Sequence, residues 1–232
     1  MSASDSAVPE QSGDAPVPTA ESYFWPLTAL VVVILPQVLV PARMRLGPPS
    51  AVPIVEAIVV LLALTVAAKP GPVPRAARPL MLWLFGVLVL ANTAAAARLV
   101  TIVLRGSPDS EISSSVSRLL VAAVIVLTTN IVTFGLLYWQ LDGGGPTGRL
   151  ARPAPYPDFQ FPQTGTAGMS PPNWHPRFPD HLFVSFTNVV SFSPTDTLPL
   201  TTRVKGLMAL QSMISVSVLV VVLARVINSL PS

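Results

Sequence analysis

The sequence contains no cysteine and few charged residues. The missing cysteines exclude disulfides, thiolate metal sites and catalysis by a cysteine nucleophile, and they leave the redox compartment undetermined. Only 11% of the 232 residues are charged and 51% are hydrophobic, whereas a soluble domain carries roughly 25% charged residues. Together with a mean hydropathy of +0.62, this scarcity of charge predicts that lipid solvates much of the chain.

The sequence also lacks the motifs of common enzymatic chemistry. It has no G-x-S-x-G, no H-E-x-x-H and no pair of carboxylates within one apolar segment. The glycines at 143–145 are not followed by the Lys and Ser or Thr of a phosphate-binding loop, so they predict a flexible turn after a helix. His175 and His181 lie near Asp180, but their spacing matches no common metal-ligand pattern. We therefore expect no enzyme activity, no cofactor and no metal site.

The basic residues do not indicate a nucleic-acid partner. The pI is about 9.8, but the net charge is only +3, and most Lys and Arg residues stand beside apolar segments. That is the juxtamembrane pattern rather than a phosphate-binding stripe, so the expected partner is the lipid bilayer. Residues 1–21 are acidic and rich in Pro, Ser and Ala, which predicts a disordered tail and no cleavable signal peptide.

Five apolar runs are long enough to cross a bilayer, which takes about 20 apolar residues. They are residues 23–40, 52–68, 80–104, 116–138 and 204–230. Prolines, glycines and arginines separate the runs, and aromatic residues at their ends suit the membrane interface. The predicted fold is an all-α integral membrane protein with about five transmembrane helices, in the cell (inner) membrane. Basic residues divide almost evenly between the two sides of this topology, so they do not determine its orientation.

The chain divides into a tail (1–21), a three-helix membrane region (22–112) and a C-terminal region (113–232). Within the last region, residues 140–179 are rich in Gly, Pro, Asp and aromatics, which predicts an exposed loop with some aromatic anchoring. Residues 180–192 form an apolar stretch too short to cross a bilayer, which predicts a re-entrant or interfacial half-helix before the last spanning helix.

This order of segments resembles the pore-loop hairpin of a potassium channel. A spanning helix is followed by a half-helix, a polar turn and another spanning helix. Residues 182–188, L-F-V-S-F-T-N, stand where the family has its pore helix. Residues 191–196, S-F-S-P-T-D, stand at the filter T-V-G-Y-G-D, with Asp196 at its aspartate and Pro199 shortly after it.

The filter position departs from that family in its chemistry. The family filter needs glycines with unusual backbone dihedrals, and Ser193 and Thr195 take their place here. Thr195 is β-branched, and Pro194 fixes its own φ and restricts the residue before it. These residues argue against a selective potassium filter.

The C-terminal part also resembles a group of uncharacterised bacterial multi-pass membrane proteins. The likeness lies in F-P-Q (161–163), S-F-T-N (185–188), F-S-P-T-D (192–196) and A-R-V-I-N (224–228). That group has a channel-like hairpin and no assigned activity, so this resemblance implies a family rather than a function.

Two functions stay open. The first, which the sequence favours, is a pore-loop ion channel of unknown selectivity, with monovalent cations as candidate ions. It requires a homo-oligomer such as a tetramer, because one pore loop cannot surround an ion. The second is a non-conducting membrane scaffold or accessory subunit that keeps the hairpin for packing. A small-solute transporter is disfavoured because the sequence shows no inverted repeat. In a channel, the residues near the pore mouth would be Ser185, Thr187, Asn188, Ser191 and Asp196.

Polar residues also occur inside the apolar runs. Glu56 and Arg98 fall at similar depth in consecutive antiparallel runs, which allows an intramembrane charge pair, although snorkelling to the interface explains each residue as well. Polar patches in the last two long runs suit either a water-filled path or hydrogen bonds between helices. Their members are Thr128, Thr129, Asn130, Thr133, Gln211, Ser212 and Ser215.

We predict that residues 180–192 do not cross the membrane, because their apolar length is too short. The natural chain has no cysteine, so single cysteines at positions 170 and 200 can be labelled with an impermeant maleimide in intact vesicles. Both cysteines are expected to react from the same side. Labelling from opposite sides contradicts the half-helix.

Overall fold

The computed structural model describes residues 21–39, 77–105, 115–149, 156–166, 168–171, 174–191 and 196–229, together with positions 54, 57, 58 and 61. The predicted run 52–68, including Glu56, therefore lies almost wholly outside the described residues, so the expected Glu56–Arg98 pair stays a prediction. Residues 192–195 of the filter-like turn lie outside them too.

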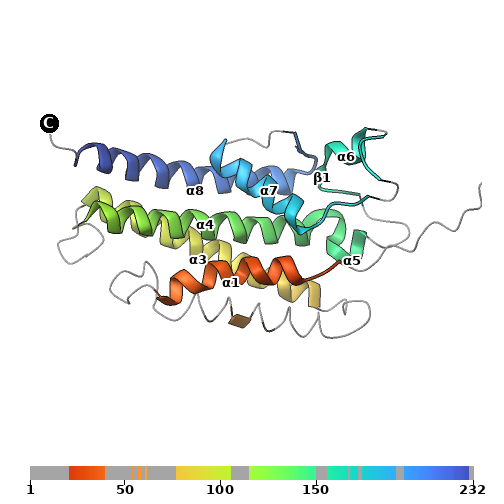
Figure 1. Ribbon diagram of the computed structural model, residues 1–232, viewed down its shortest axis with the longest axis horizontal. Coiled ribbons are helices and arrows are strands. Elements are labelled where there is room, and N and C mark those ends of the chain that lie inside the picture. The colour runs from red at the N-terminus through yellow and green to blue at the C-terminus, as the bar shows by residue number, and fades with distance from the viewer. Residues whose placement is uncertain are drawn as a thin grey trace, which may run out of the picture.

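Among the described residues, several helices run side by side along the long axis of the molecule (Figure 1). They are α1 (Phe24–Leu39), α3 (Ala77–Arg105), α4 (Val116–Leu141) and α8 (Thr202–Ile227). α4 packs against each of the other three, and α3 also packs against α8. A further helix, α7 (Phe178–Val190), has 13 residues against the 26 of α8, and it packs on both α4 and α8. α4 is therefore the central element of the bundle.

Three helical stretches of the described chain are long and apolar enough to cross a membrane. They are Arg78–Arg105, Val116–Arg149 and Thr202–Ile227. α1 is apolar as well but has only 16 residues. The expectation of an all-α fold with apolar, membrane-length helices is confirmed in this general form. In place of the predicted half-helix at 180–192, α7 begins two residues earlier, at Phe178, and ends at Val190.

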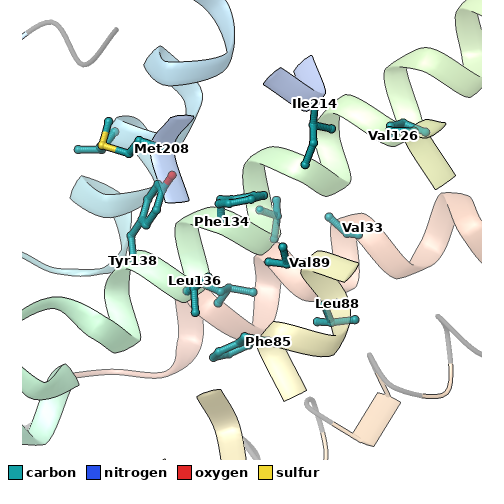
Figure 2. Packing of buried hydrophobic residues seen from close by; sticks show 14 of the residues in the cluster. Val33, Phe85, Leu88, Val89, Val126, Phe134, Leu136, Tyr138, Met208 and Ile214 are labelled. Carbon is teal, nitrogen blue, oxygen red and sulfur yellow. The ribbon is translucent and has the colours of Figure 1, made fainter. Parts of the chain in front are cut away.

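Much of the packing between the helices is apolar (Figure 2). Buried side chains from four helices meet there, among them Val33 of α1, Leu88 and Val89 of α3, Phe134 of α4 and Ile214 of α8. Other large apolar side chains point outward: Leu90 is 70% exposed, Leu104 71% and Met213 69%. An apolar interior and an apolar exterior together are the pattern of helices that lipid solvates.

α4 ends where the sequence has three consecutive glycines. Residues 143–145 have φ angles of 53°, 81° and 81°, in the left-handed region that side chains with a Cβ avoid. The 3-10 turn η2 (Asp142–Gly144) and the short helix α5 (Gly145–Arg149) follow. This reversal brings Arg149 back to the end of α4, where its Nη1 donates to the carbonyl oxygens of Trp139 at 2.9 Å and Asp142 at 2.8 Å.

A small antiparallel sheet lies beyond that turn. β1 (Phe159–Gln160) pairs with β2 (Leu198–Pro199), with Phe159 opposite Pro199 and Gln160 opposite Leu198. The short helix α6 (Pro162–Gly165) follows β1. The sheet thus connects the segment before α7 to the segment before α8.

The prediction of an exposed loop over 140–179 is wrong for much of the part that the structure describes. Asp158, Phe159 and Phe161 are buried there, as are Gln140 and Asp142. Phe159 packs edge-on against Tyr138 of α4, with ring centroids 5.3 Å apart. Phe159 and Phe161 therefore cover the end of the bundle, because their apolar rings are more stable out of water.

α7 approaches α4 closely at one glycine. A Cβ added to Gly135 would lie 3.1 Å from Leu182 Cδ1 and 3.2 Å from Leu182 Cα. The second of these atoms is backbone, so the contact cannot be relieved by turning a side chain alone. Gly135 therefore sets the distance between α4 and α7.

We predict that Gly135→Val destabilises the fold by about 1–3 kcal/mol, because the larger side chain overpacks the α4–α7 contact. Gly86→Val is the matched control, since nothing lies within 4 Å of a Cβ at Gly86 in α3. The free energy of unfolding in detergent micelles, followed by circular dichroism, measures both variants. Equal effects of the two variants would contradict the proposed close contact.

Candidate functional site

Two buried polar clusters join the helices. The first, the amide network, consists of Asn130 and Tyr138 of α4, Ser185 and Asn188 of α7, and Gln211 and Ser215 of α8. All six side chains are buried. Tyr138 contributes its hydroxyl group to the network, while its ring belongs to the apolar core. Polar side chains at such positions are stabilised when they bond across helices, since neither lipid nor an apolar core supplies partners.

Gln211 is the centre of the amide network. Its Oε1 accepts hydrogen bonds from the Tyr138 hydroxyl at 2.8 Å and from Asn188 Nδ2 at 2.9 Å. Its Nε2 donates to Ser185 Oγ at 2.6 Å and to the Ser185 carbonyl at 3.2 Å. Both ends of this one amide are therefore used, and they connect α8 to α4 and to α7.

The remaining members extend the network along the bundle. Asn130 Nδ2 donates to Ser215 Oγ at 2.9 Å, and Ser185 Oγ donates to the carbonyl of Ile131 at 2.7 Å. Asn188 Nδ2 also donates to the carbonyl of Met208 at 3.0 Å. The three helices are thus held by bonds between side chains and by bonds from side chains to backbone.

The second cluster, the ionic quartet, consists of Glu21, Asp142, Arg149 and His181. Asp142 Oδ2 lies 3.0 Å from His181 Nε2 and 4.0 Å from Arg149 Nη1, and Arg149 Nη2 lies 3.0 Å from Glu21 Oε2. The side chains are 6% exposed or less. Two carboxylates and two basic groups are therefore buried together at the α5 end of the bundle.

The quartet is bonded to backbone and aromatic groups around it. Asp142 Oδ1 accepts from the backbone N–H groups of Asp158 and Phe159, at 2.8 and 3.1 Å. Glu21 Oε1 accepts from Trp139 Nε1 at 2.8 Å and from the backbone N–H of Phe178 at 2.7 Å. These bonds connect the segment before α1, the end of α4 and the start of α7.

A neighbouring ion pair holds the small sheet. Asp158 is fully buried, and both of its carboxylate oxygens accept from the guanidinium of Arg203, with Arg203 Nε 2.7 Å from Asp158 Oδ1. The Thr201 hydroxyl donates to Asp158 Oδ1 at 2.6 Å, and the Leu200 N–H donates to the Asp158 carbonyl at 2.8 Å. Asp158 therefore fixes the entry into α8.

The chemistry available to His181 is limited by its contacts. Its Nε2 faces Asp142, and its Nδ1 lies 2.8 Å from the carbonyl oxygen of Arg177. The rings of Phe159 and Phe161 pack edge-on against the imidazole. Neither ring nitrogen is open to take a proton from a substrate, so this geometry is not that of a general base. Among the described residues, no three His, Asp or Glu side chains are grouped to hold a metal.

The structure separates the five candidates for a pore mouth. Ser185 and Asn188 are buried members of the amide network, and Thr187 is buried with its hydroxyl bonded to the carbonyls of Phe183 and Val184 in its own helix. Ser191 and Asp196 are exposed. The first three side chains therefore face the interior of the chain.

The sequence reasoning missed the ionic quartet. It placed His181 beside Asp180, but Asp180 caps α7 by accepting from the Arg177 N–H at 2.7 Å, and the partner of His181 is Asp142. Asp142 and His181 are 39 residues apart, and Arg149 and Glu21 are 128 apart. One signal was available, since Asp142 stands directly between a membrane-length apolar run and three glycines, where a carboxylate needs partners.

Comparisons with known proteins give no match: no family model fits the chain, and no curated protein or solved structure is significantly similar to it. The site must therefore be interpreted from its own geometry.

We predict that Gln211→Leu lowers the free energy of unfolding by about 1–3 kcal/mol, because Tyr138 and Asn188 lose their shared acceptor while buried. Leu keeps a similar volume. Ser217→Ala on the same helix is the control, since Ser217 is exposed and bonds only to the Met213 carbonyl of its own helix. Denaturant unfolding in micelles compares the two, and a loss no larger in Gln211→Leu than in the control would contradict the role of the network.

Proposed function

We propose that this chain is a non-conducting, multi-pass integral membrane protein with a scaffold or accessory role, in which α7 is a packing element rather than a pore helix. The observation that carries this proposal is the use of Ser185 and Asn188 inside the chain. A pore helix presents polar groups to ions or to the filter. Here those groups are bonded to Gln211, Met208 and Ile131 instead.

The attachment of α7 along its length supports the same function. His181 and the N–H of Phe178 hold its beginning to the ionic quartet, and the close approach at Gly135 holds its middle to α4. Ser185 and Asn188 hold the second half to α4 and α8. A helix bonded on so many sides within one chain has few polar groups left for an ion path.

The outer surface supports the membrane location. Three helical stretches of the described chain have the length and apolarity for spanning, and large apolar side chains of α3 and α8 point away from the core. With α1 and the run at 52–68, the proposed topology has about five spans, with α7 as a half-helix, in the cell membrane.

The competing function is a cation channel built as a homo-oligomer, in which Ser191 and Asp196 would be the polar groups left on the surface near a shared axis. Asp196 is exposed, as a carboxylate at a pore mouth must be. The two functions predict different outcomes in the same assay.

We expect the purified protein in liposomes to give no potassium or sodium flux above that of empty liposomes, because the polar face of α7 is occupied within the chain. Gramicidin added to the same liposomes shows that the assay detects flux. Flux in the parent protein that falls in Asp196→Asn would overturn the proposal in favour of a channel, because Asn keeps the size and hydrogen-bonding oxygen of Asp and removes its charge. Light scattering in detergent adds a second measurement, since a monomer contradicts a pore that needs several copies.

A further inference from the structure

The ionic quartet carries a charge balance that depends on one proton. Glu21, Asp142 and Arg149 together have a net charge of −1 if both carboxylates are ionised. All four side chains are nearly inaccessible to solvent, and an uncompensated charge in such a place is strongly destabilising. A cationic His181 makes the quartet neutral.

The ring contacts of His181 require the same protonation state. Its Nδ1 lies 2.8 Å from the Arg177 carbonyl, and its Nε2 lies 3.0 Å from the Asp142 carboxylate. Both neighbours are acceptors when Asp142 is ionised, so both ring nitrogens must donate. A neutral imidazole carries one N–H and one lone pair, and its lone pair would then face an acceptor.

The surroundings of Asp142 favour its ionised form. Its Oδ1 accepts two backbone N–H groups, from Asp158 and Phe159, and its Oδ2 lies within 4.0 Å of Arg149. Burial favours the neutral acid, whereas hydrogen bonds from N–H donors and nearby cations stabilise the carboxylate. The shared proton of the Asp142–His181 pair therefore belongs on the imidazole.

From this geometry we propose that the ionic quartet is a proton-dependent clasp: while His181 is an imidazolium ion, the clasp fixes the segment before α1 and the start of α7 onto the end of α4, and loss of that proton weakens it. Glu21 reaches Trp139 and the Phe178 N–H from within the quartet. A single protonation event thus acts on three elements that are far apart in the sequence.

Other titratable groups near His181 have partners of their own. Asp180 of α7 caps its helix at Arg177, Asp158 pairs with Arg203 of α8, and the Tyr138 hydroxyl of α4 donates to Gln211. Tyr23 packs edge-on against Trp139, with ring centroids 5.4 Å apart. The carboxylate in contact with His181 is that of Asp142, which interacts in turn with Arg149 and, more weakly, with Arg203.

The direction of the pH effect follows from proton linkage. The proposed clasp requires a proton on His181 in the folded chain, whereas an unfolded histidine releases its proton around pH 6.5. Folding then takes up a proton above that pH, so stability is greatest in mild acid and falls as the pH rises. One proton taken up on folding changes the unfolding equilibrium constant by up to about tenfold per pH unit.

Nitrogen NMR of ¹⁵N-histidine-labelled protein in micelles tests the protonation state directly. The chain has two histidines, so His175→Gln leaves His181 as the source of every ring signal. We expect both ring nitrogens to show the shifts of a protonated imidazolium at pH 7.5. A neutral ring, with one unprotonated nitrogen, overturns the proposal, and this includes the arrangement in which Asp142 holds the proton.

The pH dependence of stability tests the clasp with a matched pair of variants. His175→Gln keeps the clasp, and the double variant with His181→Gln removes its titrating group. Denaturant unfolding from pH 6 to 8 is expected to show a loss of stability with rising pH in the first and a smaller loss in the second. Equal slopes overturn the proposal. If the double variant does not fold, the test rests on His175→Gln alone, through its NMR spectrum and the pH dependence of its stability. Stability of His175→Gln that does not change from pH 6 to 8 also overturns the proposal.

Discussion

The main constraint on this structure is that a polar side chain inside an apolar bundle is stabilised only by hydrogen-bond partners that the protein itself supplies. Gln211 meets it with both ends of its amide, accepting from two helices and donating to one of them. Because the donors and the acceptor of an amide point in fixed directions, these hydrogen bonds can form in only a few orientations of α8 about its helix axis. An apolar interface between the same helices would tolerate several rotations of similar energy, so the amide network supplies specificity that apolar packing alone lacks.

The same constraint explains how the short helix α7 stays packed against the two long helices α4 and α8. α7 is too short for apolar contacts along its length to hold it by themselves. Part of its surface is also apolar and exposed, with Phe183 53% and Val190 58% exposed. Its opposite face carries His181, Ser185 and Asn188 at intervals of four and three residues, which places them in one row on a helix. Each member of this row has a partner on another element. The row gives α7 one preferred orientation.

Sequence reasoning predicts much of the fold because apolar length and periodicity are local properties. The runs at 80–104, 116–138 and 204–230 correspond to α3, α4 and α8, and glycines follow the ends of α3 and α4 in the sequence. Pairings between distant residues are not local. The preference of Ser185 and Asn188 for Gln211 rather than for a pore depends on how α7 rotates against α8, which no spacing within α7 reveals. The buried segment around Phe159 was also missed, because Gly, Pro and Asp are typical of exposed loops, and only contact with Tyr138 shows otherwise.

The bonds of Glu21 have a consequence for biosynthesis. Its partner Arg149 is 128 residues further along the chain, and the N–H of Phe178 is 157 residues further. At a translation rate of about 5–20 residues per second, the second partner leaves the ribosome roughly 8–30 s after Glu21. The first partner, Arg149, leaves it roughly 6–26 s after Glu21 at the same rate, and until then the carboxylate has no partner from α5 or α7. α1 can form early, but its leading end has all of these bonds only after the start of α7 has been synthesised, which makes this contact one of the last to form.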